Sequence, residues 1–248
     1  MTLHFDGVAF WYNRKTAVLS DFNLSVSDPA TVLLGPNGAG KSTLLALAAS
    51  QLAPKAGRVS WKRLSPSRGR DRTPYRRAVA WLPQSVTAMP GLTVREQVAY
   101  AGWLKGMSRT DAWDASREAL KRVNLSELAD RRSHQLSGGQ ARRMGLAGAL
   151  THESELILMD EPTAGLDPTQ RKVFRNLLAQ LVPEVHVLVS THQTEDLADT
   201  YSHVVVLDRS AVLFQGSTRD FHGLTGTGHL GLREQAEAAY ASLVQREV

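Results

Sequence analysis

The stretch GPNGAGKST, residues 35–43, decides the fold of this chain. It follows the apolar run TVLL, residues 31–34, and precedes LLALA, residues 44–48, so the order is strand, glycine-rich turn, helix. In this context the pattern G-x-x-x-x-G-K-[ST] brings backbone N–H groups against phosphate oxygens, and the helix points its positive end at the same anion. A glycine-rich turn without a ligand is the alternative, which the Lys-Ser-Thr ending disfavours.

Two side chains of this loop and one aromatic residue before it suggest what binds there. Lys41 can reach the outer phosphates as a point charge, and Ser42 can offer its hydroxyl to a magnesium ion. Tyr12 is the candidate for stacking on a purine ring, with Phe10 and Trp11 as competitors. Ordinary packing of aromatic residues in a strand is the alternative for all three.

Composition narrows the class of protein. The chain has 248 residues, 42% hydrophobic content and no cysteine, so disulfides and thiolate metal sites are excluded. No apolar run approaches the ~20 residues that a membrane helix needs, and the N-terminus lacks the pattern of a signal peptide. We therefore expect a soluble intracellular protein. His152 and Glu153 do not predict a metal site, because no second histidine follows at helical spacing.

The formal net charge is +5, and much of the excess comes from residues 62–77, KRLSPSRGRDRTPYRR. Such a segment can bind nucleic acid or an anionic membrane surface, or form only a solvated face. Because it holds two prolines, one glycine and few apolar residues, we predict an exposed, mobile loop.

The remaining pattern predicts an α/β chain with a helical insertion. From Pro90 to about Arg132 the apolar period is helical. Thr93 and Glu96 form a capping box there, and a second helix begins near Ser108 or Thr110. Further helices are predicted over residues 169–181 and from Leu232 onward. Strands are predicted over residues 2–12 and 17–26, as an antiparallel hairpin, and over 58–61, 78–82, 156–159, 185–190, 204–207 and 212–214.

Two more motifs carry candidate chemistry. LSGGQ, residues 136–140, places two glycines at a helix start and makes a second anion-binding surface. LILM, residues 156–159, is a short apolar strand ending in Asp160-Glu161, at the edge where open α/β sheets hold ligands. A helix-capping acidic pair is the alternative. His192 also follows a predicted strand, with a structural histidine as its alternative.

Taken in order, these motifs resemble the ATP-binding cassette (ABC) ATPases over roughly residues 2–222. GPNGAGKST resembles the Walker A loop, and Gln84 falls at the Q-loop position. LSGGQ is the family's own signature, and LILMDEP looks like Walker B with its glutamate. Residues 164–167 resemble the D-loop, and His192 resembles the switch histidine. Residues 90–106 are similar to the helical subdomain of transporter ATPases, particularly bacterial exporters.

The resemblance implies a P-loop NTPase fold of the ABC ATPase type. Such a fold has a mostly parallel core sheet flanked by helices, an N-terminal antiparallel β subdomain and an inserted α-helical subdomain, here at about residues 85–150. The implied division is an ABC ATPase domain over residues 1–224 and a linker and helix over residues 225–248.

The resemblance also assigns site roles for an ATPase that uses ATP and Mg²⁺. Glu161 is implied as the general base, and His192 as a partner of the γ-phosphate or the water. Ser42, Gln84 and Asp160 are implied around the metal ion, and Gln84 is also implied as a catalytic residue. The implied nucleotide contacts are Tyr12, Gly35, Asn37, Gly38, Ala39, Gly40, Lys41, Ser42, Thr43, Ser137, Gly138, Gly139, Gln140 and Asp167.

In the family two cassettes pair head to tail, so Ser137 would cap the γ-phosphate held by the other copy. The implied partners are a second cassette, identical or not, and a separate integral membrane subunit whose short helix enters a groove beside residues 85–135. The implied location is cytoplasmic, peripheral on the inner face of the cell membrane. The alternative is a soluble ABC ATPase acting on nucleic acid, ribosomes or cofactor assembly, which the single cassette without a long coiled coil disfavours.

The helix after the signature departs from the family's usual pattern at Ala141, Gly145 and Gly148. A glycine inside a helix costs up to about 1 kcal/mol relative to alanine. Two glycines therefore predict a weaker helix, unless close packing or a partner offsets the loss.

Overall fold

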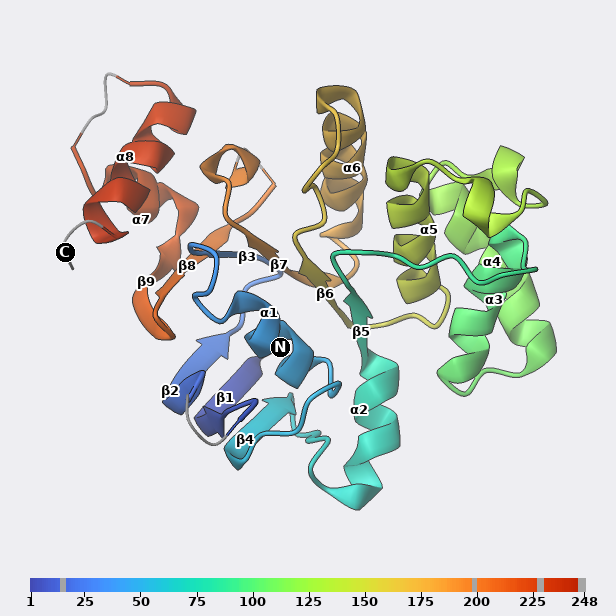
Figure 1. Ribbon diagram of the computed structural model, residues 1–248, viewed down its shortest axis with the longest axis horizontal. Helices are drawn as coiled ribbons and strands as arrows, with labels where there is room; N and C mark the ends of the chain where they lie inside the picture. The colour runs from blue at the N-terminus through green and yellow to red at the C-terminus, as the bar shows by residue number, and fades with distance from the viewer. Residues whose placement is uncertain (14–16, 198–199, 227–229, 245–248) are drawn as a thin grey trace.

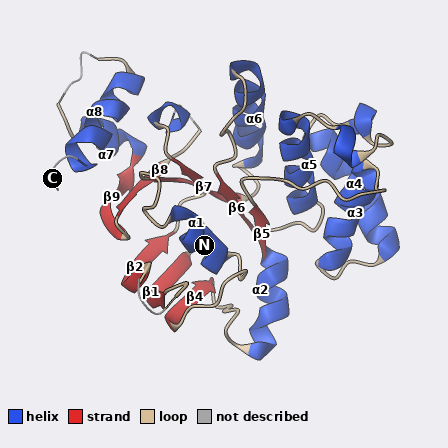
Figure 2. Ribbon diagram, in the orientation of Figure 1, coloured by secondary structure: helices blue, strands red, loops and turns tan. Residues whose placement is uncertain are grey.

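The computed structural model describes residues 1–13, 17–197, 200–226 and 230–244. Its centre is a six-stranded sheet in the order β5-β6-β7-β3-β8-β9, parallel except for the antiparallel pair β8–β9 (Figures 1 and 2). Its strands are β3 (Ala30–Leu34), β5 (Val79–Leu82), β6 (Leu156–Asp160), β7 (His186–Thr191), β8 (His203–Asp208) and β9 (Ala211–Ser217). A second, antiparallel sheet has the order β2-β1-β4, with β1 (Leu3–Phe10), β2 (Leu19–Val26) and β4 (Ala56–Trp61).

The helices complete the predicted fold class, which is confirmed. They are α1 (Lys41–Ala48), α2 (Arg72–Ala78), α3 (Val94–Leu104), α4 (Arg109–Arg122), α5 (Gly138–Leu150), α6 (Pro168–Leu181), α7 (Thr218–Gly223) and α8 (Leu232–Val244). Short 3₁₀ turns lie at Gly69–Asp71, Ser126–Leu128, Ser133–Gln135 and Thr194–Leu197.

The central strand β3 is buried on both faces and so separates two apolar cores. Val32 and Leu34 pack into a core with α5 and α6, whereas Leu33 faces α1 and the antiparallel sheet. This alternation follows from the two-residue period of a strand. Helix α1 therefore lies between the two sheets, as Figure 1 shows, and its N-terminus is held at the end of β3.

The helical segment forms as predicted. Thr93 Oγ1 accepts from the N–H of Glu96 at 3.2 Å, and Glu96 Oε2 accepts from the N–H of Thr93 at 2.7 Å, which completes the capping box. The second helix takes its N-cap from Ser108 rather than Thr110. Helices α3, α4 and α5 pack together at one end of the molecule (Figure 1).

Close packing accounts for the glycines of α5. A Cβ on Gly145 would lie 2.6 Å from Leu82 Cδ1 and 2.7 Å from Val86 Cγ2, so no side chain fits there without a shift. A Cβ on Gly148 would lie 3.2 Å from the Cβ of Ala101. The two glycines bring α5 close to β5 and α3, and this contact offsets their low helix propensity.

The prediction of a mobile loop over residues 62–77 is wrong. The segment contains α2, whose Tyr75 is fully buried and donates its hydroxyl hydrogen to the carbonyl of Ala48 at 2.5 Å. A single aromatic residue among arginines gives too little periodicity to indicate a helix. The hydrogen bond and the burial of its ring fix the segment to α1.

The C-terminal helix α8 packs against α7 and the Thr194–Leu197 turn, with Ala236 and Ala239 buried. The predicted flexible joint at residues 225–228 lies partly outside the described residues. The division of the chain at residue 224 stays a prediction. No helix among the described residues is long and apolar enough to span a membrane.

Candidate active site

A cavity of about 420 Å³ opens at the carboxyl ends of β3, β6 and β7. This is the edge at which open α/β sheets bind ligands. Of its lining residues, all but Val18 were predicted as site residues. They are Tyr12, Val18, Asn37, Gly38, Gly40, Lys41, Ser42, Thr43, Gln84, Glu161 and His192.

The loop between β3 and α1 requires glycine at its two ends. A Cβ on Gly35 would lie 2.2 Å from the carbonyl oxygen of Leu207, so the loop can pass β8 only without a side chain. Gly40 has φ +98° and caps the N-terminus of α1, a conformation that L side chains rarely adopt. The first N–H groups of α1 therefore face the cavity without intrahelical partners. Ala39, within the loop, is buried and does not line the cavity.

Lys41 holds its ammonium group at the floor of the cavity. Its Nζ donates to the carbonyls of Gly35 at 2.7 Å and Pro36 at 3.1 Å, and lies 3.8 Å from Glu161 Oε1. Burial lowers the pKa of Lys41, and the charges of Glu161 and Asp160 partly offset that effect. The site therefore places the Lys41 ammonium group, beside two carboxylates, where phosphate oxygens would meet the loop.

Asp160 lies beside the loop rather than in the cavity wall. Its Oδ1 accepts from Ser42 Oγ at 3.0 Å and from Ser190 Oγ at 2.6 Å. The carboxylate thus orients the Ser42 hydroxyl, which lines the cavity together with Gln84. A hydroxyl, an amide oxygen and a nearby carboxylate are hard oxygen donors, and they fit a Mg²⁺ ion that keeps several of its waters.

Glu161 and His192 form the pair at the mouth of the site. Nδ1 of His192 lies 2.8 Å from both carboxylate oxygens of Glu161. The Glu161 side chain is 11% exposed and that of His192 is 39% exposed, so the histidine is the more accessible partner. Glu161 has φ +47°, and its N–H donates to the carbonyl and the hydroxyl of Ser190, both at 3.1 Å. Ser190 was not predicted, because serine in a buried strand gives no signal of its own.

Of the three aromatic candidates, only Tyr12 lines the cavity. Its ring is 66% exposed, and its hydroxyl lies 3.2 Å from Thr43 Oγ1. Phe10 is buried and supports the Tyr12 ring edge-on, with centroids 5.0 Å apart. An exposed, supported ring beside the phosphate loop is available for stacking, which stays a prediction.

The signature residues do not line this cavity. Ser137 and Gln140 form a capping box at the start of α5. The N–H of Ser137 donates to Gln140 Oε1 at 2.9 Å, and the N–H of Gln140 donates to Ser137 Oγ at 3.3 Å. Asp167 caps α6 through its Oδ1, which accepts from the N–H of Gln170 at 2.9 Å. Gly138 and Gly139 begin α5, and a Cβ on Gly139 would lie 2.7 Å from Gln170 Oε1. In one chain, therefore, the two predicted phosphate-binding surfaces stand apart.

Arg142 connects the two surfaces, and sequence reasoning missed it. Its guanidinium donates to four backbone carbonyls: Glu161 at 2.9 Å, Pro162 at 2.6 Å, Ala164 at 3.2 Å and Gln84 at 2.7 Å. Burial lowers its pKa. An arginine in a helix gives no indication of which carbonyls it meets, so only the folded structure, in which α5 packs against β5, reveals the contact.

The sequence and the fold of the chain match known proteins. The family model described as ABC transporter matches residues 19–164. The chain is 38% identical to the cobalt import ATP-binding protein CbiO of Rhodobacter capsulatus, covering 86% of this chain and 77% of that protein. It is 31% identical to the energy-coupling factor transporter ATP-binding protein EcfA2 of Streptococcus thermophilus, covering 89% and 82%. It also matches an uncharacterised ABC transporter ATP-binding protein, YxlF of Bacillus subtilis, at 34% identity, covering 76% of this chain and 61% of that protein.

Among solved structures, the dimeric post-hydrolysis state of the ATP-binding cassette MJ0796, bound to ADP and Pi, has a TM-score of 0.76 at 26% identity. That match covers 87% of this chain and 98% of the other. The family model spans more than half of the chain and contains its phosphate loop, its signature and its acidic strand end. The chain therefore belongs to the ABC transporter family, as a cassette that binds and hydrolyses ATP.

Proposed function

We propose that this chain is the motor subunit of a transporter, in which two cassettes enclose ATP between them and hydrolysis drives a separate membrane subunit. One observation carries the proposal. The cavity joins the phosphate loop, Lys41 and the Glu161–His192 pair, whereas the signature stands at the N-terminus of α5, outside it. A second copy turned head to tail would bring its signature to this cavity and complete the site.

The chemistry of the cavity suits phosphoryl transfer to water, which needs positioning and charge neutralisation rather than covalent catalysis. Glu161 would align the attacking water and accept its proton, and His192 would hold the γ-phosphate or the water. Lys41 and the N–H groups at the start of α1 would bind the outer phosphates. Tyr12 would stack on the base.

Ser42, Gln84 and Asp160 would hold the Mg²⁺ ion, Asp160 through its contact with Ser42. When bound, such an ion neutralises negative charge on the phosphates as it develops. Gln84 also ties this position to α5, because its carbonyl accepts from Arg142. A change at the metal site would therefore reach the signature helix directly.

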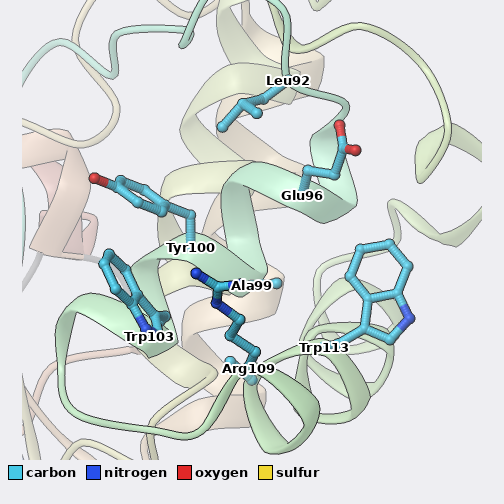
Figure 3. A pocket seen from close by; sticks show the side chains of 8 residues that line it. Leu92, Glu96, Ala99, Tyr100, Trp103, Arg109 and Trp113 are labelled. Atoms are coloured by element: carbon cyan, nitrogen blue, oxygen red, sulfur yellow. The ribbon is translucent and has the colours of Figure 1, made fainter.

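A groove on the helical segment is the proposed docking site for the membrane subunit (Figure 3). It has a volume of about 350 Å³, lies between α3 and α4, and falls within the predicted interval of residues 85–135. Its exposed aromatic side chains are Tyr100, Trp103 and Trp113. Tyr100 and Trp103 stack with centroids 5.5 Å apart, and Arg95 lies over the Trp113 ring at 3.9 Å. Ordered, exposed aromatic rings around a groove are typical anchors for a short helix.

Docking there would hold the chain at the inner face of a membrane as a peripheral protein. Two of the relatives are named for cobalt import and for an energy-coupling factor transporter. The name of the first relative, a cobalt import protein, favours import as the direction of transport for this chain as well.

Co-purification with an integral membrane subunit from native membranes tests this function. Tyr100→Ala with Trp103→Ala should abolish co-purification and leave the ATP turnover of the isolated chain within about twofold, because the groove is remote from the cavity. Leu224→Ala, which removes an exposed apolar side chain elsewhere, is the control. Retained co-purification of the aromatic variant would contradict the docking site.

A further inference from the structure

The positive charge of the chain is concentrated in one short segment, residues 62–77, called here the basic segment. It holds seven lysines and arginines and one acidic residue, a net +6, whereas the whole chain carries +5. The rest of the chain is therefore net −1. All seven basic side chains are exposed: Lys62, Arg63, Arg68, Arg70, Arg72, Arg76 and Arg77.

The basic segment is an ordered surface, not a flexible tail. Tyr75 anchors α2 through its hydrogen bond to Ala48, and Ser65 Oγ donates to the carbonyl of Val59 at 2.7 Å. Arg76 donates to both the hydroxyl and the carbonyl of Ser50 at 3.2 Å. In Figure 1 the turn after β4 and the helix α2 form the lower edge of the molecule. The arginines are thus displayed in a fixed arrangement around a buried ring.

Little of this charge is neutralised within the chain. Asp71, its one acidic residue, lies 3.9 Å from Arg68 and 3.6 Å from Arg70, and Lys62 pairs with Glu155 at 2.8 Å. Of the remaining four arginines, none has an acidic group within 4.0 Å among the residues that the structure describes: Arg63, Arg72, Arg76 and Arg77.

The positive field extends to the neighbouring helices. Burial, and secondly the charge of Arg76, lower the pKa of Lys105 to about 8. Arg77 likewise contributes to the lowered pKa of His152. Like charges therefore repel one another on this face, and an external anionic surface would relieve that repulsion.

The basic segment is continuous with the proposed docking groove. Lys105, directly after α3, donates to the carbonyls of Arg76 and, at 2.9 Å, of Val79. Trp103, two residues earlier, lines the groove. A membrane subunit seated in the groove would therefore stand next to α2.

We propose that the basic segment binds the anionic phospholipid headgroups of the membrane that holds the transport subunit. Clusters of four to eight exposed lysines and arginines attract such a surface. Single-stranded RNA is the competing anion, but its binding relies on exposed aromatic rings as stacking platforms, and the segment's one aromatic residue, Tyr75, is buried. The location of this contact rests on the proposed function, whereas lipid binding itself does not.

Co-sedimentation of the full chain with vesicles tests the proposal. The probes are vesicles of phosphatidylglycerol and phosphatidylcholine in equal parts, and vesicles of phosphatidylcholine alone. The chain should partition onto the anionic vesicles, and added salt should release it. The triple variant Arg63→Gln, Arg70→Gln, Arg77→Gln should reduce that partition about 100-fold, at about fivefold per arginine. These three side chains make no hydrogen bond to the rest of the described structure, so thermal stability should stay unchanged.

The matched control removes the same charge elsewhere. Arg117→Gln, Lys172→Gln and Arg219→Gln lie on other exposed positions and also lower the net charge from +5 to +2. The partition of this control onto anionic vesicles should fall by less than about threefold, because exposed charges far from the basic segment are screened by salt. An equal loss in both variants, equal binding to neutral vesicles, or tighter binding to an RNA oligonucleotide than to anionic vesicles would overturn the proposal. ATP turnover of the same variants reports separately on the proposed function.

Discussion

Nδ1 of His192 lies 2.8 Å from both carboxylate oxygens of Glu161, although 31 residues separate them in the sequence. The register of two parallel strands produces this contact. Asp160 at the end of β6 pairs with Ser190 near the end of β7, so the residues that follow each strand emerge at the same edge. The positive φ of Glu161 then turns its side chain toward the histidine. We infer that the pair acts as a unit on one water molecule.

Glu161→Gln should separate binding from chemistry. The amide keeps the shape of the side chain but accepts no proton, so turnover should fall about 10²- to 10⁴-fold while ATP affinity is retained. The ATP-bound dimer should also last longer. Single-turnover kinetics and size-exclusion chromatography with ATP measure both effects, and unchanged turnover would refute the base assignment.

Lys41→Ala should abolish nucleotide binding, because it removes an ammonium group that lines the cavity beside the phosphate loop. Calorimetric titration with ATP measures the change, and thermal melting without nucleotide serves as a check on folding. Burial already lowers the pKa of Lys41. Loss of its ammonium group should therefore reduce the free energy of unfolding by no more than about 1 kcal/mol relative to the parent. An ATP affinity within about threefold of the parent would show that the phosphate loop is misassigned.

Two neighbouring arginines offer a matched pair. Arg142 donates to carbonyls around the acidic strand end and Gln84, whereas Arg143 donates to the carbonyls of Val123 and Asn124, both at 3.1 Å. Either arginine-to-glutamine change should cost about 1–3 kcal/mol of stability through unsatisfied carbonyls. Only Arg142→Gln should also lower turnover, roughly 10- to 100-fold, by misplacing the site. Equal turnover in the two variants would remove the positioning role.

Acid should destabilise the chain through His152. The side chain is 5% exposed, and burial, with help from Lys105 and Arg77, lowers its pKa to about 4. In the unfolded chain the His152 ring takes up a proton near pH 6.5, whereas in the folded chain it stays neutral to about pH 4. The free energy of unfolding therefore falls as the pH drops from 6.5 to 4. The full effect is about 3 kcal/mol of unfolding free energy. Urea titrations at pH 7 and pH 5 should show a smaller drop for His152→Gln, and an identical drop would contradict this account.

Much of this architecture is readable from residue order. Phosphate loop, capping box, short apolar strands and carboxylates at a strand end each have a local physical cause, and the predicted strands formed within a few residues of their predicted bounds. The cavity likewise gathers Lys41, Gln84, Glu161 and His192, because parallel strands deliver their ends to one edge.

What the sequence did not show depends on contacts distant in the chain. Tyr75 anchors α2 through its hydrogen bond to the carbonyl of Ala48, and Arg142 donates to four carbonyls that converge on it. Ser190 holds Asp160 and Glu161 together from the neighbouring strand. No periodicity or spacing in the sequence indicates any of these contacts.

The pairing of two cassettes is tested most directly by mixing two damaged chains. Lys41→Ala spoils the phosphate loop, and Ser137→Arg blocks the signature. Each variant alone should be inactive, because both of its composite sites carry the damage. Mixed in equal amounts, half of the dimers regain one intact site, so about a quarter of the parent's turnover should return. Full turnover by the Ser137→Arg chain alone, or no recovery on mixing, would contradict the account.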